Sequence, residues 1–560
     1  MSWKEEVQKV ADEFIYTNED VNKGVKEFLR EMDEGLSHSG STLSQIPTYV
    51  TSVPNGTEKG LYLAVDLGGT NFRVCSIQLR GNTTFSLTQS KVAIPRELMV
   101  AKTSKELFSF LAKQIEVFLK THHNDHFQAV VRRRRTMSIS EGFREEEIFQ
   151  LGFTFSFPVQ QHGINRGTLI RWTKGFDIAD AVGKDVCVLL QDEIDELHLP
   201  VRVAALVNDT VGTLMARSYT SPGKTGTLLG AIFGTGTNGA YVEKLKNITK
   251  LPAASGANYD DSTGEMIVNT EWGSFDNGLR VLPNTSYDEA LDKESVNPGI
   301  QMFEKRVSGM FLGEILRRAM LALVKDPKVM LFKDEDSSSN DIHSTTNIAP
   351  DSPLFTQWGL DTSFLSIVAG DTSYGLKVIK QTLDKELGIS AASTEDAEAV
   401  KVLAAAIGKR AARLSAVPIA GIVHKSGRLG KTSASASHAA SKVKEHVQNL
   451  EVGEAAKTAA EGVQASAAPV VDLPPTGGVG NDEDDVVDIG VDGSLVEYYP
   501  GFEDYLREAL REIPEIGAKG EKKIRIGIAK DGSGVGAALI ALVAGPLTAS
   551  PPVSPIREKK

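Results

Sequence analysis

Three glycine-rich turns in this sequence carry residue types that bind anions. The first, Asp66-Leu67-Gly68-Gly69-Thr70-Asn71, joins two apolar segments and is followed by Arg73. Glycines let backbone N–H groups approach an anion closely, and Thr and Asn side chains add hydrogen bonds. An arginine supplies a fixed positive charge suited to phosphate oxygens. Taken alone, however, such a turn could equally be a tight β-hairpin.

A related layout occurs at two further places. Gly234-Thr235-Gly236-Thr237-Asn238 lies between two apolar strands, as the first turn does. Asp531-Gly532-Ser533-Gly534-Val535-Gly536 precedes an apolar helix over 537–543, and helix N-termini favour anions. The two strand turns therefore suggest two lobes that grip one polyphosphate.

Two better-known nucleotide motifs are absent. Gly223-Lys224-Thr225 resembles the end of a Walker A loop, but Ser218 stands where that motif needs its first glycine. The run 532–537 nearly fits the dinucleotide fingerprint, yet the chain leaves no room after it for a βαβ unit and a distal acid.

A second group of polar residues could bind a polyol. Asn208 and Asp209 end an apolar strand, where α/β sheets commonly place active residues. The further candidates are Ser156, Thr173, Lys174, Glu271 and Glu304. Each has an ordinary structural alternative: Asp209 could be a helix N-cap, Glu304 a solvated helix charge paired with a lysine, and Ser156 a turn residue.

These residues need strands and helices to position them. Apolar runs predict strands at 61–65, 72–77, 151–157, 201–207, 228–233 and 240–242. Helical spacing of apolar residues occurs at 7–14, 25–32, 303–315 and 404–414. Strands interleaved with helices favour an α/β architecture.

Length and composition limit the class of protein. A chain of 560 residues is too long for one core and predicts two or more domains. Its formal charge of −12 argues against nucleic acid or an anionic membrane as the main partner. Two cysteines, Cys75 and Cys187, cannot form a disulfide framework and fit a reducing compartment. The longest apolar stretch, 537–543, is too short to span a bilayer, so we expect a cytoplasmic protein.

Three segments depart from this pattern. Residues 128–148 contain Arg132 to Arg135 and then a Glu-rich run, and 424–485 contain no aromatic residue. Neither segment can bury enough apolar surface to fold alone, so both are predicted to be mobile loops or linkers. The arginine run also fits a phosphorylation site or a nuclear-type address. The Pro-rich end, 546–560, is predicted to be a disordered tail.

Taken together, the motifs resemble those of the hexokinase family, and in particular its fungal glucokinase branch. The resemblance covers about 5–545, apart from the two atypical internal segments. It rests on LAVDLGGTNFR (63–73), LGFTFSFP (151–158), WTKGF (172–176), NDT (208–210), FGTGTNG (233–239), EWG (271–273), NPG (297–299), VEYYPGF (496–502) and AKDGSGVG (529–536).

The resemblance implies a fold of two unequal α/β lobes, the two-lobed actin-like ATPase (ribonuclease H-like) fold of the hexokinase type. Sugar and ATP would lie in the cleft between the lobes. The implied parts are an N-terminal helical segment on the large lobe (1–60), a small lobe (61–207), a large lobe (208–530) and a C-terminal helix that returns to the small lobe (531–545).

The resemblance also assigns the site. ATP would contact Asp66, Gly68, Gly69, Thr70, Asn71, Arg73, Gly234, Thr235, Gly236, Thr237, Asp492, Gly493, Ser494, Asp531, Gly532 and Ser533. Sugar hydroxyls would contact Ser156, Thr173, Lys174, Asn208, Asp209, Asn238, Glu271 and Glu304. Asp209 would accept the proton of the attacking hydroxyl, and Lys174 would offset charge near the transferred phosphoryl. Mg²⁺ would accompany ATP without a dedicated set of protein ligands.

The implied activity is ATP-dependent phosphorylation of glucose at its 6-hydroxyl, the first step of glycolysis. Mannose and glucosamine are further candidate substrates, and the protein could be a monomer or a homodimer. Two alternatives remain open. One is a sugar-sensing regulatory protein with weak or no turnover, and the other is an ATPase of the same fold class that does not act on sugar.

Overall fold

The structure is a computed structural model. It describes residues 3–69, 71–136, 147–172, 175–221, 223, 225–251, 259–329, 331–333, 346–430, 486–529 and 531–548. Thr70, Thr173 and Lys174 therefore lie outside the described residues. So do 137–146 and 431–485, which make up much of the two predicted inserts, and 549–560 of the predicted tail.

The first sheet has the strand order β4-β3-β2-β5-β8. Its strands are β2 (Lys59–Leu67), β3 (Asn71–Arg80), β4 (Phe85–Ala93), β5 (Phe149–Phe155) and β8 (Val201–Val207). β2, β3 and β4 pair antiparallel, whereas β2, β5 and β8 are parallel.

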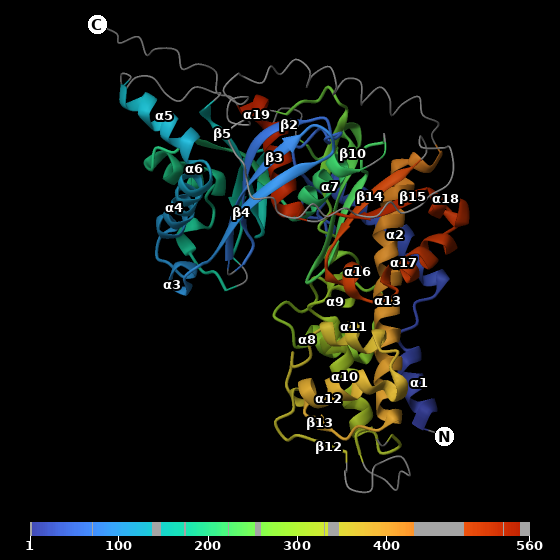
Figure 1. The fold of residues 1–560 in the computed structure, drawn as a ribbon. Coiled ribbons are helices and arrows are strands. Elements are labelled where there is room, and N and C mark those ends of the chain that lie inside the picture. Colours follow the sequence, from blue (N-terminus) through green and yellow to red (C-terminus); the bar gives the residue numbers. More distant parts are fainter. Residues whose placement is uncertain are drawn as a thin grey trace.

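Both faces of this sheet are covered by helices (Figure 1). On one face Leu63 and Val65 pack in a core with α4 (Ser104–His122) and α6 (Val186–Glu196). On the other face the intervening Ala64 packs in a second core, which includes α19 (Ala537–Thr548). Alternating burial of adjacent residues is what the alternating strand geometry requires.

The second sheet has the order β1-β11-β10-β9-β14-β15. Its strands are β1 (Ile46–Pro47), β9 (Leu229–Phe233), β10 (Thr237–Lys244), β11 (Glu265–Asn269), β14 (Val487–Asp492) and β15 (Ile524–Ile528). The strands from β1 to β9 pair antiparallel, whereas β9, β14 and β15 are parallel. α7 (Asp209–Thr220) connects the two sheets, since it follows β8 and precedes β9.

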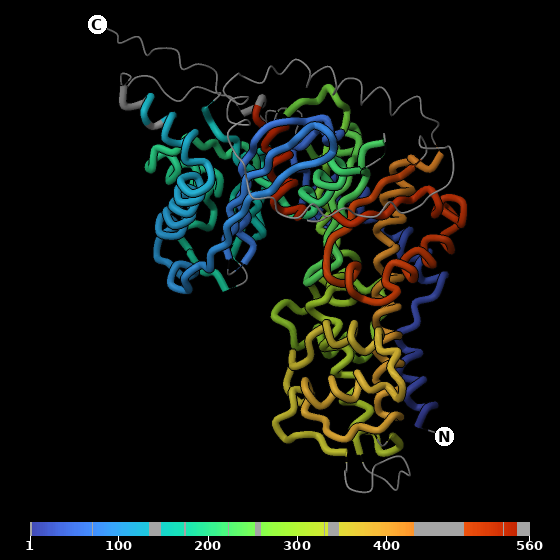
Figure 2. The backbone as a smooth tube through the Cα atoms, viewed as in Figure 1, coloured from blue at the N-terminus to red at the C-terminus, as the bar shows by residue number. Residues whose placement is uncertain are grey.

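The long helix α13 (Thr394–Ser426) runs through the part of the molecule that lies below the second sheet in Figure 1. Figure 2 shows the N-terminal helices α1 (Trp3–Asp12) and α2 (Asn18–Ser37) along the same side of this part. Other helices that pack on α13 are α9 (Glu304–Val307), α10 (Leu312–Lys325), α11 (Ser363–Gly370), α12 (Lys377–Leu387) and α17 (Phe502–Glu512). α8 (Ser286–Lys293) is joined to α13 by the ion pair of Asp288 with Arg410. Within the described ranges, no helix combines the length and the apolar character needed to cross a bilayer.

Shorter elements complete the fold. Among the described residues, the remaining α-helices are α3 (Arg96–Met99), α5 (Asn124–Thr136), α16 (Ser494–Tyr498) and α18 (Gly517–Lys523). Two small sheets pair β6 (Val159–Gly163) with β7 (Arg166–Leu169) and β12 (Asn347–Ile348) with β13 (Ile389–Ser390). A π-helical turn, Gly532–Gly536, joins β15 to α19.

The predicted strands are confirmed, but two predictions about local structure need correction. The segment 128–148 is not a loop throughout, because 128–136 belong to α5. Phe127 and Val130 on this helix are buried, and this apolar face offsets the polar arginine run. Likewise, 424–426 of the second predicted insert are the last turn of α13.

Candidate active site between the two sheets

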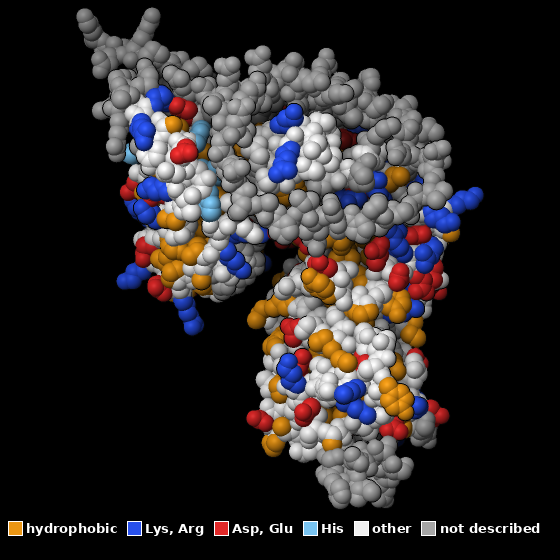
Figure 3. Space-filling model, viewed as in Figure 1, with side chains coloured by type: hydrophobic (Ala, Val, Ile, Leu, Met, Phe, Trp, Pro, Cys, Tyr) orange, Lys and Arg blue, Asp and Glu red, His pale blue; other side chains and the backbone are white. Residues whose placement is uncertain are grey.

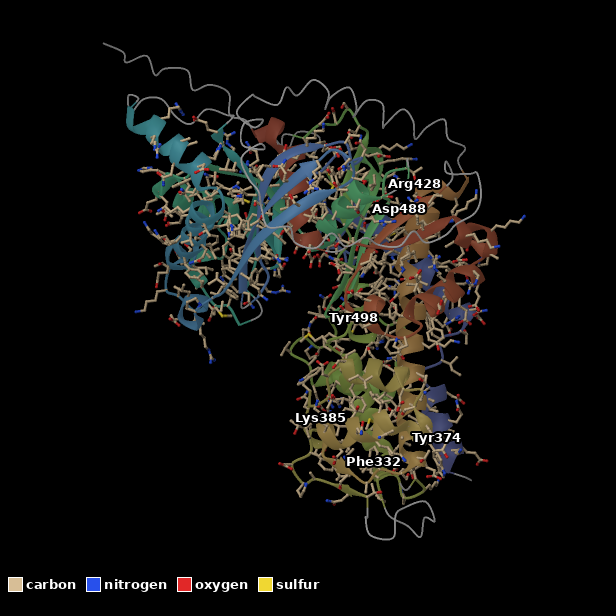
Figure 4. All side chains as sticks on the ribbon, viewed as in Figure 1. Phe332, Tyr374, Lys385, Arg428, Asp488 and Tyr498 are labelled. Atoms are coloured by element: carbon tan, nitrogen blue, oxygen red, sulfur yellow. The ribbon has the colours of Figure 1, made fainter. Side chains whose placement is uncertain are left out.

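A cleft of about 560 Å³ lies between the ends of the two sheets. Figure 3 shows the molecule hollowed between the part that carries α3–α6 and the part that carries α8–α13, and Figure 4 places Tyr498 at the edge of this hollow. The residues that line the cleft are Asp66, Gly68, Arg73, Ser156, Asp209, Thr213, Ile232, Asp492, Glu497, Tyr498, Asp531, Gly532 and Ser533.

Arg73 joins the first glycine-rich turn to the third. Antiparallel pairing of β2 with β3 sets Arg73 opposite Asp66, and its Nη2 donates to Asp66 Oδ2 at 3.0 Å. Its Nη1 donates to Asp531 Oδ1 at 3.3 Å, and its Nη2 also donates to the hydroxyl of Ser533. Burial opposes the charge, but the adjacent carboxylates keep the pKa of Arg73 above its usual value. A permanent cation therefore stands in the cleft.

Asp209 is the first residue of α7 and lines the same cleft. The helix N-cap is Asn208, whose Oδ1 accepts from Thr210 N–H at 3.0 Å. The N-cap alternative for Asp209 is therefore wrong, since its neighbour takes that position. Asp209 Oδ1 also accepts from Thr210 N–H, at 2.9 Å, so the carboxylate is oriented by the helix N-terminus, which favours negative charge.

The third turn lies directly against α7. A Cβ on Gly212 would stand 2.3 Å from Gly532 O, and one on Gly536 would stand 2.1 Å from Gly212 Cα. No real side chain tolerates such distances, so these glycines allow the two backbones to touch. Thr154 on β5 also donates to Ser533 O at 2.8 Å. These contacts place the turn from 531 to 533 beside Asp209.

The second turn, 234–237, does not line the cleft. Two of its N–H groups are bound within the protein: Gly234 N–H donates to Gly236 O at 3.0 Å, and Thr237 N–H donates to Glu304 Oε2 at 3.0 Å. Glu304 is thus not paired with Lys305, which instead contacts Asp292 Oδ1 at 2.6 Å.

Predicted sugar ligands form a separate network next to this turn. Asn238 Nδ2 donates to Glu271 Oε1 at 3.2 Å, and Asn269 Nδ2 donates to the same oxygen at 2.7 Å. Glu271 has left-handed backbone angles, with φ 54°. Burial raises the pKa of Glu271, although the two amide hydrogen bonds oppose this effect. Asn269 was not predicted from the sequence, and its place two residues before Glu271 was the available signal.

The structure brings only part of the predicted site together. Lining the cleft are Asp66, Gly68, Arg73, Ser156, Asp209, Asp492, Asp531, Gly532 and Ser533. The cleft lining does not include the other described site residues, which are Gly69, Asn71, Asn208, Gly234, Thr235, Gly236, Thr237, Asn238, Glu271, Glu304, Gly493 and Ser494. Thr70, Thr173 and Lys174 lie outside the described residues.

Four residues of the cleft were missed by the sequence analysis: Thr213, Ile232, Glu497 and Tyr498. Thr213 follows Asp209 by one helical turn, so the spacing of α7 could have identified it. Glu497 and Tyr498 belong to the family motif at 496–502, and their polar side chains were the available signal.

Comparisons with known proteins give consistent results. Two family models, both described as hexokinase, match residues 6–219 and 228–543. A glucokinase of Aspergillus niger is 59% identical over 540 residues, which are 96% of this chain and 97% of that protein. Glucokinase-1 of Saccharomyces cerevisiae is 40% identical, with 96% of this chain and 97% of that protein covered.

Among solved structures, a hexokinase from Schistosoma mansoni complexed with glucose aligns with a TM-score of 0.68 and 30% identity. The alignment covers 96% of this chain and 98% of that chain. The first matched range includes the first sheet and nearly all of α7, and the second includes the chain from β9 through the third turn. Together they contain every described residue that lines the cleft. The chain thus belongs to the hexokinase family.

Proposed function

We propose that this protein is a glucokinase, which transfers the γ-phosphoryl group of ATP to the 6-hydroxyl of glucose. Its family and its 59% identity to the Aspergillus niger glucokinase support this activity. The observation that carries the proposal is that Asp209 and Arg73 line one cleft, although they come from different elements.

The two residues would have complementary roles. Phosphoryl transfer depends mainly on positioning and on stabilising charge. Asp209 would accept the proton of the attacking hydroxyl, because its carboxylate is already oriented by the N–H of Thr210. Arg73 would bind phosphate oxygens.

The described lining of the cleft fits a magnesium ion. It contains five carboxylates, from Asp66, Asp209, Asp492, Glu497 and Asp531, against the single arginine Arg73. Mg²⁺ is usually held by one or two carboxylates, waters and substrate phosphates. Asp66 and Asp531, which both contact Arg73, would hold the ion directly or through water. An ion held there would supply positive charge that offsets the charge of the phosphate groups.

Glucose would be bound from both sides of the cleft. Ser156 already lines it, whereas Asn238, Glu271 and Glu304 form hydrogen bonds at and after the second turn. We propose that the small lobe (61–207, with the returning segment 531–545) and the large lobe (208–530) approach one another on the sugar. Such closure would exclude water, the competing acceptor of the phosphoryl group.

We also propose a cytoplasmic location. Cys75 and Cys187 are the only cysteines of the chain, and both are buried free thiols. Burial raises the pKa of Cys75 to about 12, so its thiol is poorly reactive. Two inert, unpaired thiols are consistent with a reducing compartment.

The test is an assay of glucose 6-phosphate formation by the purified protein with MgATP. Glucose, mannose, fructose and glucosamine should be compared as acceptors, and we expect the highest kcat/KM with glucose. Glucose binding without product would favour the regulatory alternative. ATP hydrolysis that glucose does not stimulate would favour an ATPase that does not act on sugar.

A further inference from the structure

Three glycines on adjacent strands form a shallow surface under α7, which we call the glycine seat. Gly230 of β9, Gly490 of β14 and Gly527 of β15 stand opposite one another in the strand register. A Cβ on Gly230 would lie 2.4 Å from Leu214 N. A Cβ on Gly490 would lie 2.6 Å from Arg217 Cβ, and a Cβ on Gly527 would lie 2.3 Å from Arg217 Cζ. Gly230 and Gly490 therefore let the backbone of α7 and the Cβ of Arg217 approach the sheet, whereas Gly527 leaves room for the Arg217 guanidinium.

Arg217 fixes α7 on this seat through a buried carboxylate. Its Nε and Nη2 donate to Oδ2 and Oδ1 of Asp488, at 3.0 and 2.7 Å. The Asp488 side chain is 0% exposed and also accepts from Arg525 Nε and from the Thr227 hydroxyl, both at 2.7 Å. Figure 4 places Asp488 at the second sheet. The two parallel bonds from Arg217 use the planar guanidinium, which a lysine cannot replace.

The elements joined here all lead to the cleft. α7 begins with Asp209, eight residues before Arg217, or about 12 Å along the helix at 1.5 Å per residue. β14 continues from Asp488 to Asp492, which lines the cleft. β15 continues from Arg525 toward Asp531, another lining residue. One buried carboxylate thus connects the three segments that supply three of the cleft's acids.

We propose that Arg217 is a positioning residue for phosphoryl transfer. Its paired bonds to Asp488 set the place of α7 on the glycine seat, and so the place of Asp209 relative to Asp492 and Asp531. The contact of Gly212 with the turn at Gly532 holds the other side of the helix. A displacement of about 1 Å at a reacting group can lower a rate by about 100-fold. The inference rests on the proposed function, in which Asp209 acts on the sugar hydroxyl.

The test is Arg217→Lys, which keeps the charge and removes the paired bonds. We expect kcat for glucose phosphorylation to fall at least about tenfold, because Asp209 is misplaced. The KM values for glucose and MgATP should stay within about threefold, since Arg217 itself does not line the cleft. Hydrogen exchange measured by mass spectrometry should be faster in the first turn of α7. If this variant does not fold, Asp488→Asn, which keeps the side-chain shape, should give the same pattern.

Arg317→Lys is the matched control. Arg317 also makes paired bonds to a buried carboxylate, Glu314, at 2.6 and 2.7 Å, but within α10. We expect it to lower the thermal midpoint while kcat stays within twofold of wild type. The proposal is overturned if Arg217→Lys keeps wild-type kcat, if exchange in α7 is unchanged, or if both variants lose kcat equally. A wild-type protein that makes no glucose 6-phosphate would contradict the proposed function, whereas the exchange comparison would still test the seat.

Discussion

The first and second glycine-rich turns have similar sequences but different surroundings. At the first, Asp66 and Gly68 line the cleft, and Arg73 extends the hydrogen bonds to Asp531. At the second, several backbone groups are bound within the protein: Gly234 O accepts from Gly309 N–H at 2.7 Å, and Thr237 N–H donates to Glu304.

A glycine in the first turn and a glycine packed against the second turn have different surroundings. A Cβ on Gly69 would meet no atom within 4 Å, so this glycine leaves open space. Gly493, which lies against the second turn, has φ 117°, and its Cβ would stand 2.4 Å from the carbonyl carbon of Phe233. The first turn therefore leaves room for a ligand, whereas the chain that follows β14 packs closely against the start of the second turn.

The largest effect is expected from Asp209→Asn, which tests the cleft side of the comparison. An amide cannot accept the proton of the sugar hydroxyl, so kcat should fall about 10²–10⁴-fold. The amide oxygen can still accept from Thr210 N–H, so the start of α7 should be preserved. Steady-state kinetics measure kcat, and titration with glucose by calorimetry measures whether the variant still binds the sugar. A kcat within threefold of wild type would refute the assignment of the base.

Arg73→Met should have the next largest effect. Charge-assisted hydrogen bonds contribute roughly 1.5–3 kcal/mol, so kcat/KM for MgATP should fall about 10–100-fold. Arg80→Met, at the exposed end of the same strand, is the matched control and should leave this constant unchanged. An unchanged KM for MgATP together with unchanged kcat in Arg73→Met would show that the first turn does not bind phosphate.

Glu271→Gln tests the network beside the second turn. The KM for glucose should rise about tenfold if the carboxylate binds a sugar hydroxyl, since a charged hydrogen bond is exchanged for a neutral one. Exposed Glu289→Gln on α8 should leave this KM unchanged.

The same variant has a pH signature in stability. Because burial raises the pKa of Glu271 above 4.5, the folded protein binds its proton more readily than the unfolded chain. The wild type therefore loses unfolding free energy as pH rises from the ordinary to the raised pKa. Glu271→Gln should have the higher thermal midpoint at neutral pH, and the difference should shrink as the pH is lowered. A difference that grows on acidification would contradict this reasoning.

The smallest effect on activity is expected for Gly69→Ala, compared with Gly493→Ala. Gly69→Ala should leave the thermal midpoint unchanged, because its methyl group meets no protein atom. It should raise the KM for MgATP a few-fold, because the methyl group would occupy space next to the predicted phosphate site. Gly493→Ala should lower the midpoint by several degrees, since a strained φ costs about 1–3 kcal/mol even before the clash. Equal midpoints for the two variants would remove the distinction between the turns.

Local patterns predicted the strands well because each strand buries alternate residues on different faces. Leu63 and Val65 lie in one core and Ala64 in the other, as the alternation indicates. Predictions failed where distant contacts override composition. Helical spacing over 303–315 is interrupted between α9 and α10, because the N–H groups of Gly309 and Met310 donate to Gly234 and Thr235.

The family, the α/β class and the residue types at the ends of the strands can all be inferred from the amino-acid sequence alone. Tertiary structure decided which of these residues meet. Arg73 contacts Asp531 across 458 positions of the chain, and Arg217 contacts Asp488 across 271. Glu304 binds Thr237 N–H rather than the neighbouring lysine. Such pairings depend on how whole elements pack, whereas a local pattern reports only which face of one element is apolar.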